Sequence, residues 1–120
     1  MSIVDANVIL RYLLDDHATL SAKAVEILEK HTVILPIEVA CEVVYVLQKV
    51  YSVTRQEIQN LLTSLLDEKL VTMDKPDVFI KALEYYANSK LDFVDTLLWA
   101  YHTVEKQEIF TFDKKLASQL

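Results

Sequence analysis

Two carboxylates in this sequence follow short runs with strand composition and precede helical patterns, where acidic groups can act on a ligand. Asp5 follows Ser2–Val4, and Asp113 follows Ile109–Thr111. In open α/β sheets, ligands bind at the carboxyl ends of the strands, so both aspartates are predicted to lie along that edge. Capping of the next helix explains either residue singly, because Asp is a favoured N-cap. Two carboxylates at one sheet edge are harder to explain by capping and favour a site.

Three further acidic residues occupy positions where a negative charge requires a structural or functional explanation. Glu42 is the only charged residue in the apolar run Val39–Leu47. Burying it unpaired would cost several kcal/mol, on the order of the lower values for ions, so it either faces solvent or serves a site. Asp92 and Asp95 lie three residues apart at the start of a helical pattern, on one face. The helix dipole alone could explain that pair, with Asp92 as the N-cap.

Carboxylates gathered in one place would repel one another and raise each other's pKa values. Divalent cations relieve that repulsion, and oxygen ligands suit Mg²⁺ or Mn²⁺. Such ions could also bridge the carboxylates to phosphate oxygens and activate a water molecule. The formal net charge of −6 argues against binding nucleic acid by bulk electrostatics. A polyanionic substrate would therefore need metal ions to reverse the sign of the site.

The composition of the chain limits the classes of protein to which it can belong. The chain has 120 residues, 52% apolar and 25% charged, which is typical of one globular domain spanning residues 1–120. Its single cysteine, Cys41, suits a reducing cytoplasm and is expected to be a packed, unreactive thiol. No secretory signal is recognised, and the longest uncharged apolar run, Val43–Leu47, is too short to span a membrane. The absence of glycine excludes a P-loop and a dinucleotide-binding fingerprint.

Strand-like and helix-like segments alternate along the chain, which predicts a mostly parallel sheet covered by helices on both faces. Thr54 and Glu57 form a capping box for one of the helices. Asp74 is a candidate cap for another. The expected strands are Ser2–Val4, Val33–Leu35, Leu70–Met73 and Ile109–Thr111. The expected helices begin at Asn7, at Leu20, at Ile37, after Thr54, at Pro76, at Phe93 and at Lys114.

Four motifs in order give the chain a resemblance to a known family. They are IVDANVILRYLL, VACEVVYVL, LDFVDTLLWA and IFTFDKKL. Together they resemble the PIN domain, and more narrowly the VapC-type toxins of toxin–antitoxin pairs. The resemblance covers essentially the whole chain. It implies a three-layer α/β fold with a parallel sheet of four or five strands flanked by helices, and RNA cleavage that depends on Mg²⁺ or Mn²⁺.

Position by position, the resemblance assigns the family's acidic site to four residues, as catalytic groups and metal ligands: Asp5, Glu42, Asp95 and Asp113. It assigns accessory positions to Asn7, Asp92, Thr111 and Arg11. Two departures leave these positions intact. The glycine that often precedes the last strand is replaced by Glu105–Glu108, and the chain ends soon after Asp113, so a fifth strand is expected to be missing.

Other functions stay open at this stage. A PIN-like protein could bind RNA or a partner without cleaving, although its acidic positions are intact. A phosphoryl-transfer domain with Asp5 as nucleophile, such as a receiver or haloacid-type phosphatase, would need a second acidic residue beside it, and Ala6-Asn7 lacks one. The apolar stripe Ile58–Leu66, with Tyr45 and Tyr51, predicts surplus apolar surface. We therefore expect a homodimer, or a complex with a cognate antitoxin.

Overall fold

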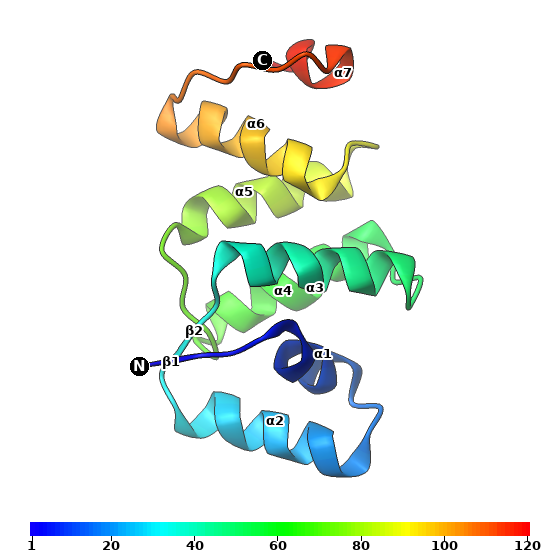
Figure 1. The fold of residues 1–120 in the computed structure, drawn as a ribbon, viewed down its shortest axis with the longest axis vertical. Helices are drawn as coiled ribbons and strands as arrows, with labels where there is room; N and C mark the ends of the chain where they lie inside the picture. The colour runs from blue at the N-terminus through cyan, green and yellow to red at the C-terminus, as the bar shows by residue number, and fades with distance from the viewer.

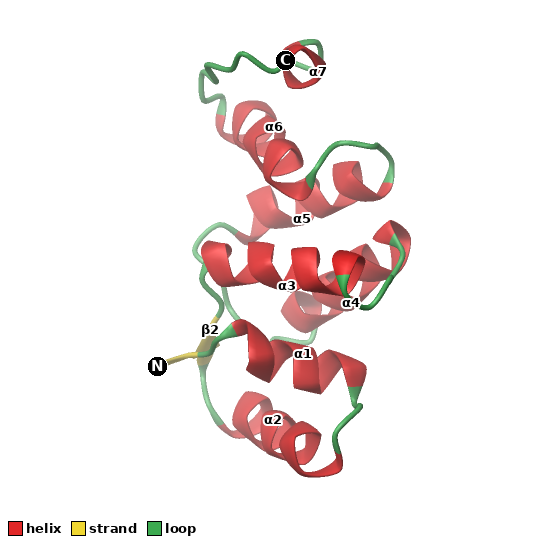
Figure 2. Cartoon of the chain, turned by 45° about the vertical axis from the view of Figure 1, so that its right-hand side comes forward, coloured by secondary structure: helices red, strands yellow, loops and turns green.

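The computed structural model describes residues 1–120 as an elongated, mostly helical molecule measuring 46 × 30 × 20 Å (Figures 1 and 2). The helices are α1 (Ala6–Leu14), α2 (Ala18–Lys30), α3 (Ile37–Lys49), α4 (Arg55–Asp67), α5 (Pro76–Ala87), α6 (Phe93–Glu105) and α7 (Lys114–Ala117). All seven helices expected from the sequence are confirmed, with small shifts at their ends. No helix combines the length and the apolar character that crossing a membrane requires.

The sheet is much smaller than predicted. Strand β1 (Ser2–Ile3) pairs in parallel with β2 (Val33–Ile34). The expected third strand is reduced to one parallel bridge from Thr72 to Ile34. It is held by the Leu35 N–H donating to the Thr72 carbonyl at 2.8 Å. The molecule is therefore an α/β domain, but the prediction of a four- or five-stranded sheet is wrong.

The expected fourth strand, Ile109–Thr111, forms no strand. Phe110 within this segment and Phe112 just after it are 89% and 107% exposed. The chain leaves α6 and continues along the same end of the molecule to α7 (Figure 1), where Leu116 is buried. Strand propensity reflects how side chains pack on a sheet, and this segment lies away from any sheet, so its propensity is not expressed.

One hydrophobic core of 23 buried residues joins helices α1 to α6 to strand β2. Helix α5 lies between α4 and α6, and α1 packs on α2 and α3. The apolar stripe of α4 belongs to this core, because Ile58, Leu62 and Leu65 are at most 2% exposed. The prediction that this stripe supplies surplus surface is wrong. The part of that prediction that named Tyr45 and Tyr51 is confirmed, because they are 62% and 39% exposed, and further exposed apolar side chains lie on α2 and near both chain ends.

Local capping signals read from the sequence are mostly confirmed. The Thr54 hydroxyl accepts a hydrogen bond from the Glu57 N–H at 3.2 Å and begins α4. Side-chain capping of this kind satisfies backbone donors that have no partner inside the helix. Asp74 is not a cap, because α5 begins after Lys75 with no side-chain capping bond. Pro76 at the first helical position needs no donor partner there, which lessens the need for a cap.

Candidate active site

Two of the predicted carboxylates share a small surface pocket. Asp5 lies two residues after β1 and Glu42 lies in α3, and both line a cavity of about 200 Å³ together with Asn7, Arg11 and Tyr51. Asp5 also caps α1, since it accepts a hydrogen bond from the Val8 N–H at 3.2 Å. Glu42 is exposed. The capping role of Asp5 leaves its second carboxylate oxygen free for a ligand.

Arg11 places a positive charge in the same pocket. Its guanidinium donates to Asp16 at 2.6 Å and to the Tyr51 hydroxyl at 3.2 Å. The hydrogen bond with Tyr51 and the charge of Asp16 raise the pKa of Arg11 above its ordinary value, so the side chain stays a cation. Tyr51 was not among the predicted site residues. It lies just beyond α3, and no spacing in the sequence relates it to Asp5 or Glu42.

A second acidic group forms around the start of α6. Asp95 lies in the first turn, and Asp92 occupies the N-cap position without making a side-chain capping bond. Asp113 caps α7, where its carboxylate accepts a hydrogen bond from the Leu116 N–H at 3.0 Å. Burial raises the pKa of Asp95, and the nearby charges of Asp113 and Asp92 raise it further. The charges of Asp113 and Asp92 therefore act unfavourably on the charged form of Asp95.

Helix α3 stands between the two acidic groups. Cys41 on α3 lines a groove of about 380 Å³ together with Asp92 and Asp95, whereas the adjacent Glu42 lines the pocket of Asp5. No group of three or more His, Cys, Asp or Glu side chains lies close enough to hold a metal ion. The oxygen donors suit Mg²⁺ or Mn²⁺ chemically. Their arrangement here does not fit a metal ion, because the predicted convergence of all four carboxylates is not seen.

Arg55 fixes the loop that leads into the second acidic group. Its guanidinium donates to the carbonyl oxygens of Tyr86 at 3.0 Å and Leu91 at 2.7 Å. It also lies over the Tyr86 ring, 4.2 Å from the ring centre, in a cation–π contact. This loop leads directly into α6, so the contacts of Arg55 help to fix the positions of Asp92 and Asp95. Sequence reasoning missed Arg55 because its partners are backbone carbonyls far away along the chain.

The remaining predicted accessory residue, Thr111, lies just before α7. Its hydroxyl accepts a hydrogen bond from the Asp113 N–H at 3.0 Å. This bond fixes the backbone at Asp113 and so helps to set where its carboxylate points. Thr111 is therefore placed to orient one of the predicted acidic residues.

The sequence model of the PIN domain family matches residues 2–119. Comparison with curated proteins and with solved structures finds no match. PIN domains are in general nucleases, and they typically use divalent metal ions. Because the match spans nearly the whole sequence, the chain belongs to the PIN domain family.

Proposed function

We propose that this protein is an endoribonuclease that depends on Mg²⁺ or Mn²⁺ and acts as the toxin of a type II toxin–antitoxin pair. The observation that carries this proposal is the PIN family match over residues 2–119. The four motifs that resemble VapC-type toxins support the narrower assignment. Such a protein would act in the cytoplasm, on RNA, and would be bound by a cognate antitoxin.

The proposed catalytic carboxylates are Asp5, Glu42, Asp95 and Asp113. These carboxylates form two groups, and we assign each group a different role in the reaction. The pocket of Asp5 and Glu42 also holds the Arg11 cation, which can attract a phosphate oxygen of RNA. In the other group, burial and then the charges of Asp113 and Asp92 raise the pKa of Asp95, so a nearby cation would stabilise its charged form.

The second candidate function is binding of RNA or a protein partner without cleavage. One observation favours it, namely the separation of the carboxylates into two groups with no metal-binding cluster. The intact acidic positions weigh against it. A phosphoryl-transfer domain with Asp5 as nucleophile is less well supported, because the family match is to PIN domains.

The test of the proposed function is an RNA cleavage assay with purified protein. We expect cleavage of single-stranded RNA in the presence of Mg²⁺ or Mn²⁺, and loss of cleavage on addition of EDTA, because the acidic groups need a counter-charge to approach a polyanion. Restoring excess Mn²⁺ after EDTA should restore cleavage. Contaminant-free protein that leaves a broad RNA panel intact with both metals, but retards RNA in a gel shift, would instead support the binding function.

A further inference from the structure

A groove of about 380 Å³ lies between helix α3 and the start of α6. One face of α3 contributes Cys41, Tyr45 and Gln48, which follow one another at helical spacing. The start of α6 contributes the residues from Asp92 to Asp95. Clefts that bind small molecules in proteins have volumes of about 300 to 1,000 Å³. The groove is therefore large enough for a ligand of the size of one nucleotide.

The apolar side chains of this groove suit a flat aromatic ligand. Val44 and Phe93 are buried, whereas Tyr45 and Val94 are 62% and 54% exposed. A ring that lay against Tyr45 would cover apolar surface that now faces water. Proteins hold unpaired nucleobases by stacking them on exposed aromatic side chains in this way. The apolar part of the groove therefore favours a nucleobase.

The polar side chains of the groove favour one base in particular. Asp92 occupies the N-cap position but makes no side-chain capping bond, so both of its carboxylate oxygens can accept hydrogen bonds from a ligand. Guanine offers two adjacent N–H donors on its Watson–Crick edge, whereas the other RNA bases alternate donors with acceptors there. One carboxylate can therefore accept both guanine donors. The Gln48 amide lines the same groove and can donate to the neighbouring guanine carbonyl.

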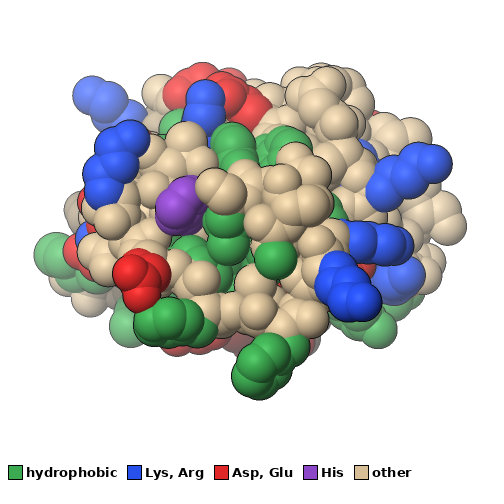
Figure 3. Space-filling view, turned by 90° about the horizontal axis from the view of Figure 1, so that it is seen from above, with side chains coloured by type: hydrophobic (Ala, Val, Ile, Leu, Met, Phe, Trp, Pro, Cys, Tyr) green, Lys and Arg blue, Asp and Glu red, His purple; other side chains and the backbone are tan.

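Lys49, the last residue of α3, supplies a positive charge to the groove. It is exposed, and the ion pairs of the chain do not include it. A lysine ammonium binds a phosphate oxygen as a point charge. Figure 3, seen from the α7 end, shows Lys and Arg side chains at opposite sides of that face and not in one band. With a net charge of −6, stacking and one local cation must hold the RNA.

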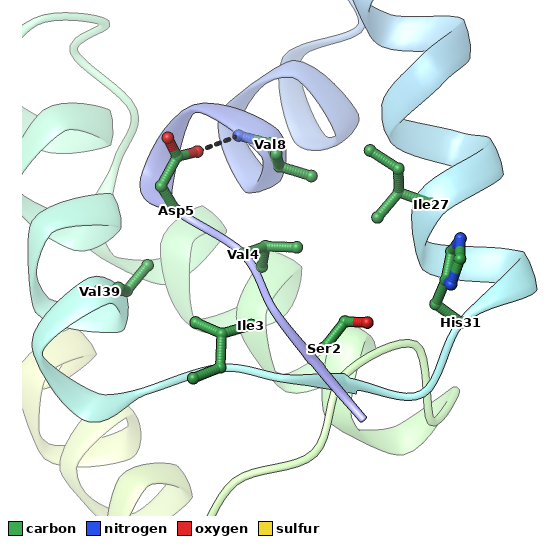
Figure 4. A pocket seen from close by; sticks show the side chains of 8 residues that line it. All are labelled: Ser2, Ile3, Val4, Asp5, Val8, Ile27, His31 and Val39. Atoms are coloured by element: carbon green, nitrogen blue, oxygen red, sulfur yellow. Dashed lines mark hydrogen bonds between the residues drawn. The ribbon is translucent and has the colours of Figure 1, made fainter.

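The cavity of about 610 Å³ beside β1 lacks this combination of side chains. Its walls are mainly apolar, and Figure 4 shows Val8, Ile27 and Val39 among them. The Asp5 carboxylate there is directed toward the Val8 N–H, from which it accepts a hydrogen bond (Figure 4). No lysine or arginine lines this cavity, and His31 is its only ring. The groove between α3 and α6 is therefore the better fit for a nucleotide.

We propose that the groove between α3 and α6 binds one unpaired guanine of RNA. The inference rests on the proposed function, because it gives the nuclease a base by which to select its substrate. Tyr45 stacks on the guanine ring, Asp92 accepts its two N–H donors, and Lys49 binds an adjacent phosphate. Asp95 lines the same groove, so the bound guanine places the neighbouring RNA backbone beside one of the proposed catalytic carboxylates.

Binding of short RNA in the presence of EDTA tests the proposal without any need for activity, because EDTA removes the metal ion that the proposed cleavage requires. The probes are fluorescently labelled uridine hexamers with or without one central guanosine, and the readout is fluorescence anisotropy. The hexamer with guanosine should bind roughly 10-fold more tightly than the uridine hexamer. A hexamer with inosine, which lacks the 2-amino donor of guanosine, should bind with intermediate affinity.

Variants assign the binding to individual side chains. Tyr45→Ala should weaken binding of the guanosine hexamer by on the order of 10-fold, and Tyr45→Phe should retain it, because stacking needs only the ring. Asp92→Asn should remove the preference for guanosine, because it replaces an acceptor with a donor while Asn still suits the N-cap position. Lys49→Gln should weaken both hexamers equally and reduce the salt dependence. Leu20→Ala and Lys23→Gln, at exposed positions on α2, are the matched controls and should bind like the wild type.

Equal affinity of the wild type for the two hexamers overturns the proposal, and so does a guanosine preference that survives both Tyr45→Ala and Asp92→Asn. Absence of binding to any hexamer at high micromolar protein overturns it as well. If Tyr45→Ala then also lowers the mass of the protein in solution, the groove is a contact between protein chains. A wild type that binds guanosine through these residues but cleaves no RNA with Mg²⁺ or Mn²⁺ refutes the nuclease function alone. Cleavage of RNA with no preference for guanosine in binding refutes the guanine site alone.

Discussion

Asp5→Asn and Asp95→Asn are each expected to reduce RNA cleavage by roughly 100-fold or more, the size typical of losing a group that acts on the reacting atoms. Asn is nearly isosteric with Asp and caps helices almost as well, so the fold should survive both changes. The loss would therefore report on the carboxylate charge. The measurement is the initial rate of RNA cleavage under saturating Mn²⁺ for the wild type and both variants.

The same variants distinguish a catalytic role of Asp5 and Asp95 from a purely structural role at the start of a helix. If Asp5 only caps α1, as its hydrogen bond to the Val8 N–H allows, Asp5→Asn would leave cleavage intact. Asp67→Asn, an exposed change at the end of α4, is the matched control and should leave cleavage unchanged. Equal losses in the control would show that net charge, and not a site, governs the reaction.

Stability of the metal-free protein gives a second signature at Asp95. Its pKa is raised, by burial first and then by Asp113 and Asp92. A raised carboxyl pKa means that the folded state loses stability as pH rises from the unfolded pKa through the folded one. At neutral pH the penalty is fully present, so Asp95→Asn should melt at a higher temperature than the wild type. The difference should shrink in acid, where Asp95 is protonated in both states.

Arg55→Met is expected to lower the free energy of unfolding by roughly 2–3 kcal/mol, because the carbonyls of Tyr86 and Leu91 lose a charged donor and Tyr86 loses its cation. Cleavage should fall as well, since this loop leads into Asp92 and Asp95. Urea denaturation measures the first effect, and the RNA assay measures the second.

Two controls make the Arg55 prediction specific. Arg55→Lys should recover only part of the stability, because lysine lacks the planar donor fork that spans two carbonyls. Gln56→Ala changes a neighbouring exposed side chain and should stay within about 0.5 kcal/mol of wild type. An Arg55→Met protein as stable as wild type would show that the loop is held by other contacts.

Local signals in the sequence located the helices but not the sheet. The capping box of Thr54 and the proline before α3 act on residues only a few positions away. The start of each helix can therefore be predicted from the local sequence. Strand pairing joins residues far apart in the chain. Residues Ile109–Thr111 have strand composition, yet where they lie is decided by the docking of α7. The composition of a segment indicates that it can form a strand. The three-dimensional arrangement of the chain decides whether a partner strand lies beside it.

Some of the predicted carboxylates lie near one another, but the expected gathering of all four is not seen. The position after a strand identified Asp5, and its pairing with Glu42 in one pocket is seen. Proximity of Asp95 to Asp113 is seen as well. The gap between these groups depends on how α3 and α6 pack, for which no spacing in the sequence gives a signal. Arg55 and Tyr51 were missed because their contacts reach across the fold.

The most direct test of the proposal that Asp5 and Asp95 take part in metal-dependent cleavage, although the structure places them in two separate acidic groups, is thermal melting with and without Mn²⁺. A ligand that binds only the folded protein raises its melting temperature by mass action. We expect Mn²⁺ to raise the melting temperature of the wild type, and to raise those of Asp5→Asn and Asp95→Asn much less. An equal shift in all three proteins, or no shift in the wild type, would contradict the claim.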